Sequence, residues 1–383
     1  MKMGVLYPRS NAHPGITAQF IDGLRSALQH HQLSQEVQLV SESIGFGGVE
    51  KEVYEKAEKL LVLEGADMLV AFVDMRILEL LKPLLYSSDK LVLVVNTGAN
   101  YPENWVPQAN IVHLTLQHSF LTRLTGKMAA RQEDKNAAMA TSFYDCGYLH
   151  TSAMAKGFMK EGGLITYNYV NNGLYDDTFE IKPLTDHLTS NASIYNLLCV
   201  FDSLPASLLY SRLNNFEGAA RLHLFVSPMM LEAQAFEEQG SSFKFAINGY
   251  LPWHASLENS SNQEFMAGYL KQTKKTATFF SLLGWETGLV IQEIFSKGEE
   301  QYSDGAAMVA SLSTVVINSP RGEMTLDAGT NYFIAPVYKC SLPQNTDRLL
   351  IEKIDFPEQQ WAEFTKELFE GVSSGWTNIY LCY

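Results

Sequence analysis

The chain has few cysteines and no long hydrophobic run. Its 383 residues contain four cysteines, and none of them stands in a CxxC pair or at a zinc-ligand spacing. Four are also too few for a disulfide scaffold in so long a chain, so we expect inert thiols and no metal site. No segment approaches the roughly 20 apolar residues of a membrane-spanning helix. The cysteines are Cys146, Cys199, Cys340 and Cys382.

Positive charge is scarce as well. The chain has 28 lysines and arginines against 42 acidic residues, a formal net charge of −14, and no basic block. Such a chain is a poor candidate for binding nucleic acid or an anionic membrane. The first residues contain no apolar signal-peptide core. The sequence as it stands therefore predicts a cytoplasmic protein, or a periplasmic one if a signal segment was removed.

The sequence motifs of common enzymes are missing too. There is no G-x-S-x-G elbow, no Walker A loop and no H-E-x-x-H. The segment Gly45–Gly48 lacks the third glycine of the dinucleotide fingerprint and favours a plain turn. We therefore predict a protein that is not an enzyme and that binds no cofactor.

What the chain does have is an alternation of short apolar runs and amphipathic segments. Met68–Phe72 and Leu91–Asn96 are typical of strands buried on both faces, and Ile16–His30 carries apolar residues at helical spacing. The alternation occurs twice, and its second series includes an expected helix over Leu231–Glu238. A turn rich in proline and glycine, Asn318–Gly322, predicts a late hairpin. The pattern indicates an α/β protein with parallel sheets in two lobes.

Three segments carry a family resemblance. They are Gly4-Val5-Leu6-Tyr7-Pro8 with Phe20-Ile21-Asp22-Gly23-Leu24, then Asp145-Cys146-Gly147-Tyr148 with Ala153–Phe158 and Gly162-Gly163, and lastly Ser319-Pro320-Arg321-Gly322-Glu323-Met324-Thr325-Leu326-Asp327. In this order they resemble the type I periplasmic-binding-protein fold. The chain is most similar to the branched-chain amino-acid-binding (Leu/Ile/Val-type) family of ABC-transporter substrate-binding proteins.

The resemblance implies two doubly wound Rossmann-like lobes joined by three crossovers. Lobe 1 would take residues 1–116 plus 250–328, and lobe 2 residues 117–249 plus 329–383. It also implies a non-catalytic solute-binding protein. Such a protein traps a small polar ligand, such as an amino acid or an amide, in the interlobe cleft by hinge closure. It serves ABC-type uptake with a permease, or metabolite sensing with a signalling partner.

Two alternatives to the solute-binding protein remain open. One is an enzyme, such as a hydrolase, on a two-lobed α/β scaffold. The other is a scaffold whose cleft is degenerate and that binds a partner protein.

Candidate ligand residues follow the expected strands, because ligands of open α/β sheets bind outside the carboxyl ends of the strands. By the resemblance, Thr97 lies in the segment that receives a ligand carboxylate. Arg9 would clamp an acidic group, and Asp74 would pair with an amine or cap a helix. The candidates from lobe 1 are Arg9, Ser10, Asp74, Asn96, Thr97, Gly98 and Ala99.

Further candidates come from lobe 2 and the second crossover. Asp202 would bind an ammonium group from the side opposite Thr97. A family glutamate that often holds the ammonium has no clear match, since Met229 and Met230 occupy its region. These further candidates are Tyr144, Asp145, Cys146, Tyr148, Phe201, Asp202, Ser203, Ser227, Tyr250 and Trp253. Tyr250 and Trp253 would either stack on a ligand or pack in a core.

Overall fold

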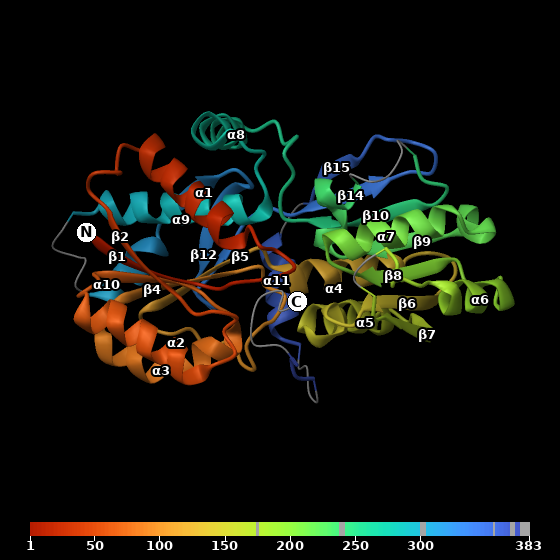
Figure 1. The fold of residues 1–383 in the computed structure, drawn as a ribbon, viewed down its shortest axis with the longest axis horizontal. Helices are drawn as coiled ribbons and strands as arrows, with labels where there is room; N and C mark the ends of the chain where they lie inside the picture. The colour runs from red at the N-terminus through yellow and green to blue at the C-terminus, as the bar shows by residue number, and fades with distance from the viewer. Residues whose placement is uncertain (174–175, 237–241, 299–303, 355–356, 368–371, 376–383) are drawn as a thin grey trace.

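The computed structural model consists of two lobes that lie side by side along the long axis of the molecule (Figure 1). It describes residues 1–173, 176–236, 242–298, 304–354, 357–367 and 372–375. One lobe is built on an eight-stranded sheet and the other on a seven-stranded sheet. The predicted two-lobed α/β fold is therefore confirmed.

The sheet of the first lobe has a parallel core. Its strands are β1 (Lys2–Tyr7), β2 (Gln38–Ser43), β3 (Met68–Phe72), β4 (Leu91–Asn96), β5 (Ile111–Thr115), β11 (Val316–Ser319), β12 (Gly322–Asp327) and β13 (Tyr332–Ile334). They run in the order β11-β12-β13-β5-β4-β3-β1-β2. β13 extends the core in parallel, and β11 and β12 form the predicted antiparallel hairpin at its edge.

The sheet of the second lobe repeats this plan. Its strands are β6 (Asn136–Ser142), β7 (Leu164–Asn171), β8 (Asn196–Val200), β9 (His223–Val226), β10 (Ala246–Leu251), β14 (Tyr338–Leu342) and β15 (Leu350–Lys353). They run in the order β15-β14-β10-β9-β8-β6-β7, with β14 and β15 antiparallel. The parallel strands of both lobes thus follow the order 2-1-3-4-5, and the strand order reverses between β1 and β3 and between β6 and β8.

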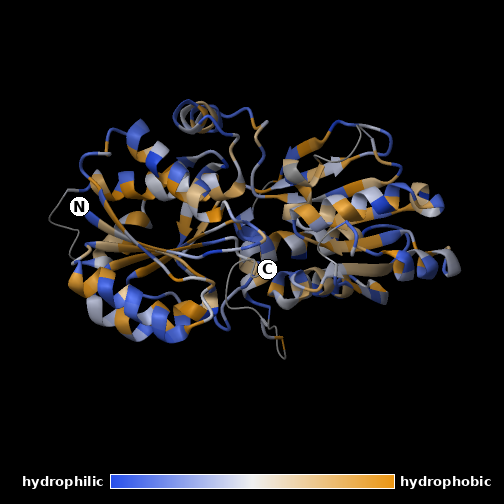
Figure 2. Ribbon diagram, in the orientation of Figure 1, coloured by the Kyte–Doolittle hydropathy of each residue, from blue (hydrophilic) through white to orange (hydrophobic). Residues whose placement is uncertain are grey.

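Helices cover both faces of each sheet, and their apolar sides turn inward (Figure 2). In lobe 1, α1 and α9 pack on one face and α2 and α3 on the other. In lobe 2, α4 and α5 cover one face and α6 and α7 the other. The helices are α1 (Ile16–His30), α2 (Glu50–Glu58), α3 (Met75–Ser88), α4 (His118–Ala129), α5 (Leu149–Lys160), α6 (Lys182–Ser190), α7 (Ser203–Asn214), α8 (Ser260–Thr273), α9 (Phe279–Phe295), α10 (Gly305–Leu312) and α11 (Pro357–Thr365).

Short helical turns complete the lobes. They are η1 (Lys59–Leu63), η2 (Asp145–Gly147), η3 (Glu217–Arg221), η4 (Pro228–Leu231) and η5 (Ala233–Phe236). The last two replace the helix expected over Leu231–Glu238, whose final two residues lie outside the described part of the chain. The Met230 carbonyl accepts a hydrogen bond from the Tyr210 hydroxyl at 2.8 Å, and this tertiary contact holds the turn in place.

The chain changes sheet after β5, after β10 and between β13 and β14. β10 ends at Leu251 and pairs within the second sheet, whereas β13, which begins at Tyr332, pairs within the first. The division into lobes at residues 116, 250 and 328 remains a prediction. The second change of sheet comes after Leu251 and the third after Ile334, slightly later than the predicted positions 250 and 328.

Each lobe contains one pair of helices that touch through glycine. A Cβ atom built on Gly284 of α9 would lie 2.0 Å from the Phe20 carbonyl oxygen of α1. In the second lobe, a Cβ on Gly126 of α4 would lie 2.1 Å from the Met154 carbonyl oxygen of α5. No larger residue fits at these contacts, so the paired helices are held backbone to backbone.

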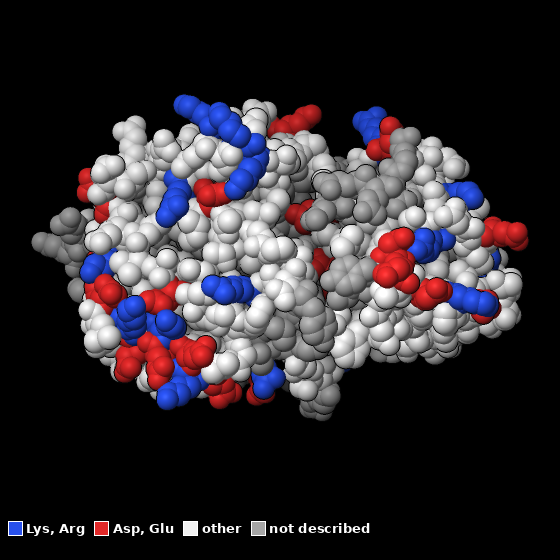
Figure 3. Space-filling model, viewed as in Figure 1, with Lys and Arg blue, Asp and Glu red and all other residues white. Residues whose placement is uncertain are grey.

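Charged side chains of both signs are interleaved over α2 and α3 on the face in Figure 3. Lys56 and Lys59, for instance, both pair with Glu42. Within the described residues, no helix is both long enough and apolar enough to cross a lipid bilayer. Three thiols are free: Cys146 is exposed, Cys199 and Cys340 are buried, and Cys382 lies outside the described residues.

A buried ion pair joins the elements around the crossovers. The Arg321 guanidinium, in the turn between β11 and β12, donates two hydrogen bonds of 2.7 Å to the Glu286 carboxylate of α9. It also donates to the Thr115 carbonyl oxygen at the end of β5, at 3.1 Å. The Tyr338 hydroxyl of β14 donates to the Arg321 carbonyl oxygen at 2.6 Å. This one residue therefore ties both sheets to α9.

We expect Glu286→Gln to lower the free energy of unfolding by about 3 kcal/mol or more, because it leaves a buried guanidinium without its counter-ion. Urea denaturation measures this loss. The matched control is Asp186→Asn, which removes the exposed Lys182–Asp186 pair and should cost less than about 1 kcal/mol. Equal losses for the two variants would contradict the role given to Arg321.

Candidate functional site

The loops at the carboxyl ends of the parallel strands meet between the two lobes. His13, in the loop between β1 and α1, places its Nε2 2.5 Å from the Oδ2 of Asp202, in the loop between β8 and α7. These loops lie at the positions where the strand order reverses in each sheet. Open α/β sheets bind their ligands at such positions. The interlobe contact therefore marks the candidate site.

Two aspartates of the second lobe form the acidic side of this site. The backbone N–H of Asp202 donates to the Oδ2 of Asp145 at 2.9 Å, and the Ser142 hydroxyl donates to the same oxygen at 2.5 Å. The backbone N–H of Ser203 donates to the Oδ1 of Asp202 at 2.7 Å. Both carboxylates are buried and held by donors from their own lobe. Their positions are therefore fixed.

The protonation of the site is governed by burial and by mutual charge. Burial, followed by the charge of Asp202, raises the pKa of Asp145 to about 7. Burial likewise raises the pKa of Glu232, at the end of η4, to about 7. Burial opposes charge on Asp202 as well, but His13 holds the pKa of Asp202 below its ordinary value. Burial also opposes charge on His13, but the Asp202 carboxylate raises the pKa of His13. Three carboxyl groups thus surround one imidazolium, an environment that favours further positive charge.

Each lobe caps a helix of the other. The first two N–H groups of α5, from Leu149 and His150, donate to the Asn100 Oδ1 and the Ala99 carbonyl oxygen of lobe 1, both at 2.8 Å. In return, the Glu232 carboxylate of lobe 2 accepts the first N–H of α9, from Phe279, at 3.1 Å. Helix N-termini carry unsatisfied donors, so these contacts stabilise the closed arrangement of the lobes.

Four buried polar atoms at this interface have no hydrogen-bond partner among the described residues. They are the Thr97 Oγ1, the Gln117 Nε2, the His150 Nδ1 and the Ser203 Oγ, and their residues are only 1–4% exposed. Buried polar groups are nearly always hydrogen-bonded, and leaving one unpaired is costly. Thr97 lies in the loop after β4, Gln117 directly before α4, and His150 and Ser203 in the first turns of α5 and α7.

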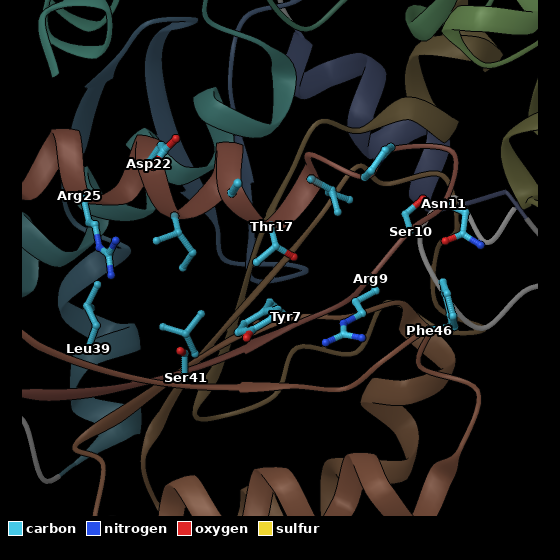
Figure 4. Close-up of a pocket in the computed structure, with 15 residues that line it drawn as sticks. Tyr7, Arg9, Ser10, Asn11, Thr17, Asp22, Arg25, Leu39, Ser41 and Phe46 are labelled. Carbon is cyan, nitrogen blue, oxygen red and sulfur yellow. The ribbon is translucent and has the colours of Figure 1, made fainter. Parts of the chain in front are cut away.

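Among the residues predicted for this site in lobe 1, Arg9, Ser10 and Asp74 border two different hollows. Arg9 and Ser10 line a groove on the side of the lobe (Figure 4). Asp74 caps α3 and accepts a 2.8 Å hydrogen bond from Asn100, and burial raises its pKa to about 6. It borders a cavity of about 1000 Å³ that both lobes line, with Asn100 and Tyr101 from lobe 1 and Leu149 from lobe 2. Their roles in ligand binding remain predictions.

The loop after β4 is shaped by its own hydrogen bonds. The Asn96 side chain bonds the Val73 carbonyl oxygen and the Gly98 N–H, and the Thr97 carbonyl oxygen accepts from the His118 N–H. Gly98 has a φ of +72°, and a Cβ there would lie 2.8 Å from the Gln117 nitrogen. The loop therefore fits against the start of α4, and the Thr97 hydroxyl has no hydrogen-bond partner among the described residues.

The remaining predicted residues divide between the interface and the cores. Tyr148 is buried and stacks on His150 at 5.7 Å, whereas Cys146 is exposed and donates to the Phe143 carbonyl oxygen. Four more are buried, namely Phe201 against Phe179, Tyr250 in an apolar core, Ser227 against the Phe201 carbonyl oxygen and Trp253 hydrogen-bonded to Asn262. Tyr144 is half-buried in the loop after β6. Binding by these residues remains a prediction.

Sequence reasoning missed His13, Gln117 and Glu232. His13 stands in a polar loop whose only signals are Pro14 and Gly15, and nothing in its sequence indicates that it reaches the other lobe. Glu232 lies two residues beyond Met230, next to the region in which the family resemblance places a glutamate.

Comparison with known proteins agrees with the two-lobed fold. Residues 1–345 match the family described as periplasmic binding protein. The chain belongs to this family. No curated protein matches it. Among solved structures, this periplasmic binding protein resembles an ABC transporter substrate-binding protein from Sphaerobacter thermophilus, with a TM-score of 0.76 and 14% identity over 93% of this chain and 97% of that one.

Two similar structures were solved with ligands. A solute-binding protein of an ABC transporter from Rhodopseudomonas palustris BisB5, in complex with 3,4-dihydroxy benzoic acid, has a TM-score of 0.68 and 14% identity over 94% of this chain and 99% of that one. LivJ from Streptococcus pneumoniae, a branched-chain amino acid transporter substrate-binding protein in complex with isoleucine, has a TM-score of 0.67 and 10% identity over 92% and 99%. At these identities the likeness extends to the fold of this periplasmic binding protein.

We expect His13→Asn to lower the free energy of unfolding by about 2 kcal/mol at mildly acidic pH, because it removes a charge-assisted bond between the lobes. Because the pKa of His13 is raised in the folded protein, the contribution of His13 to stability is complete below pH 6.5. That contribution is lost as the pH rises through the raised pKa of His13. Because the pKa of Asp202 is lowered in the folded protein, the contribution of Asp202 to stability is present above pH 3.8. That contribution is lost as the pH falls through the lowered pKa of Asp202.

Urea denaturation of both proteins between pH 4 and pH 9 measures this difference. The difference should be largest between about pH 4 and 6.5 and should shrink at alkaline pH. The control is His30→Asn, which changes an imidazole that is 37% exposed and lies 3.8 Å from Glu264. A difference that grows with pH would contradict the assignment of the interlobe pair.

Proposed function

We propose that this periplasmic binding protein is a solute receptor that closes its two lobes over a small molecule carrying a protonated amine. The observation that carries the proposal is the set of carboxyl groups of Asp145, Asp202 and Glu232 between the lobes, together with four buried polar atoms that have no partner among the described residues. An ammonium group offers three donors and a positive charge to such carboxylates. Its binding would favour their ionised forms.

The unpartnered atoms suit the rest of such a ligand. The amide N–H of Gln117 is a donor, and the hydroxyls of Thr97 and Ser203 both donate and accept. A carboxylate, amide or hydroxyl group on the ligand would satisfy them from both lobes at once. The ligand class is therefore a small polar amine, such as an amino acid or an amino amide.

Membership of the family and the names of the similar structures support a role without catalysis, with delivery of the solute to an ABC permease. Metabolite sensing with a signalling partner is the alternative role. The location of the protein, cytoplasmic or periplasmic, stays a prediction from the sequence. The predicted lack of cofactor and metal is part of the same proposal.

One observation favours a second function, that of a scaffold for a protein partner. His13 reaches across the interface to Asp202, and its ring packs edge-on against Phe280 at 5.2 Å. The protein's own side chains thus occupy part of the space between the lobes. A degenerate interlobe site of this kind would bind no solute.

Native mass spectrometry distinguishes the two functions. The protein is purified without denaturation, and its native mass is compared with its denatured mass. A stoichiometric excess that disappears on denaturation supports the receptor. If there is no excess, a thermal-shift screen of amino acids, amides and small acids follows. Failure of every compound in the screen would favour the scaffold.

We expect Thr97→Ala to weaken binding of a solute identified in this way about tenfold, because it removes one hydrogen bond in a dry site. The thermal midpoint of the unliganded variant should change little, because the hydroxyl has no partner among the described residues. Isothermal titration calorimetry measures the affinity. Thr314→Ala, at an exposed position between α10 and β11, is the control. Unchanged affinity in Thr97→Ala would remove Thr97 from the site.

A further inference from the structure

A cavity of about 1000 Å³ lies at the junction of the two lobes and the C-terminal part of the chain. Small-molecule sites in proteins have volumes of about 300–1,000 Å³, so this cavity is large enough for a compact organic molecule. None of the three carboxyl groups of the proposed solute site, those of Asp145, Asp202 and Glu232, is among its described lining residues. The cavity therefore presents a different set of side chains to a guest.

An aromatic platform forms part of the cavity wall. The rings of Tyr101 and Trp105 lie nearly parallel, at an interplanar angle of 17° and with their centroids 6.2 Å apart. Three further rings pack edge-on around Trp105, namely Tyr332 at 5.3 Å, Trp361 at 5.1 Å and Phe364 at 5.6 Å. Trp105 itself is half-buried and lines the cavity. Because the surrounding rings hold it in place, its indole offers a preorganised surface on which a flat ring can stack.

Asp74 brings a buried carboxylate to the same cavity. The residue is 5% exposed, and its carboxylate accepts from the Asn100 amide at 2.8 Å and from the Arg76 backbone N–H at 3.2 Å. Both donors are neutral, and Asp74 forms no ion pair within the described part of the chain. A buried carboxylate without a counter-ion is costly, so this position favours a positively charged guest.

The other charged groups at the cavity do not take the place of such a guest. Glu367 already pairs with two cations of lobe 2. Glu103 is exposed and adds a second carboxylate without an ion pair among the described residues. Arg76 is exposed as well and forms no ion pair with Asp74. The buried end of the cavity is therefore acidic, and its single guanidinium belongs to an exposed residue.

Asn100 connects the buried carboxylate to the other lobe. Its Nδ2 donates to Asp74, and its Oδ1 accepts the first N–H of α5, from Leu149, at 2.8 Å. Leu149 also lines the cavity, so the wall includes both ends of an interlobe hydrogen bond. An ionised Asp74 only accepts hydrogen bonds, so a cation that keeps it ionised also keeps the Asn100 amide in the orientation that this bond requires.

We propose that this cavity is a second binding site, selective for a small aromatic molecule that carries a protonated amine. Trp105 stacks on the aromatic ring, and the Asp74 carboxylate accepts hydrogen bonds from the ammonium group. The proposal does not rest on the solute site at Asp145 and Asp202, because the two sites use different carboxylates.

The test titrates phenethylamine and tryptamine into the full chain by isothermal titration calorimetry. The titrations are made at pH 8, which is above the pKa of about 6 that burial gives Asp74. We expect saturable binding of both aromatic amines. The alcohol 2-phenylethanol has the ring without the charge, and ethylamine has the charge without the ring. Each of these two should bind at least about tenfold more weakly than phenethylamine.

The variants Asp74→Asn and Trp105→Leu should each weaken binding of the preferred aromatic amine about tenfold or more. Asparagine caps helices as well as aspartate does, so Asp74→Asn keeps the cap on α3. The matched controls are Asp186→Asn, which removes an exposed carboxylate, and Tyr195→Leu, which removes an exposed ring. Both controls lie in lobe 2 outside the cavity and should leave binding unchanged.

Glu103→Gln tests the proposal without touching the buried wall, because Glu103 is exposed. It should weaken binding about threefold, as expected for the loss of an exposed charge. Absence of saturable binding by both aromatic amines would overturn the proposal, and so would equal affinities for phenethylamine and 2-phenylethanol. Binding that is lost in Thr97→Ala and kept in both Asp74→Asn and Trp105→Leu would also overturn it, because that result would assign the amine to the interlobe site.

Discussion

The ion pair of Arg321 and Glu286 is the contact on which the arrangement of the lobes depends. A buried charge is tolerated only when it is paired, and this pair is fully buried. Its partners lie beside the places where the chain passes between the lobes: Thr115 before the first crossing, α9 after the second and Tyr338 after the third. The Arg321 guanidinium therefore ties the end of β5 to α9, and the Arg321 carbonyl oxygen holds β14 of the other lobe.

The interlobe site follows from that placement. Opposed loops bring His13 to Asp202, and they bring each lobe to the helix N-termini of the other. Burial raises the pKa of Asp145 and of Glu232, because it disfavours their charged forms.

The sequence predicted the scaffold better than the site. Runs such as Met68–Phe72 and Leu91–Asn96 appear as strands with those same bounds, because parallel buried strands leave a continuous apolar signal. The acidic pair Asp145 and Asp202 could also be placed at strand ends. His13 and Gln117 could not, because a polar loop residue gives no sign of which surface it will meet. The exposed state of Arg9 likewise depends on how far α1 covers the sheet.

The glycine contacts described in each lobe have a practical consequence. Because Gly284 and Gly126 let neighbouring helices touch backbone to backbone, the helices of a lobe have no room to slide against each other. The paired helices of each lobe therefore keep a fixed spacing, and we expect a change of the angle between the lobes to leave each pair intact. A pair of fluorescent dyes, one on α2 and one on α7, would convert that single angle into a distance. With such a dye pair, the protein would serve as an optical sensor of the angle between its lobes.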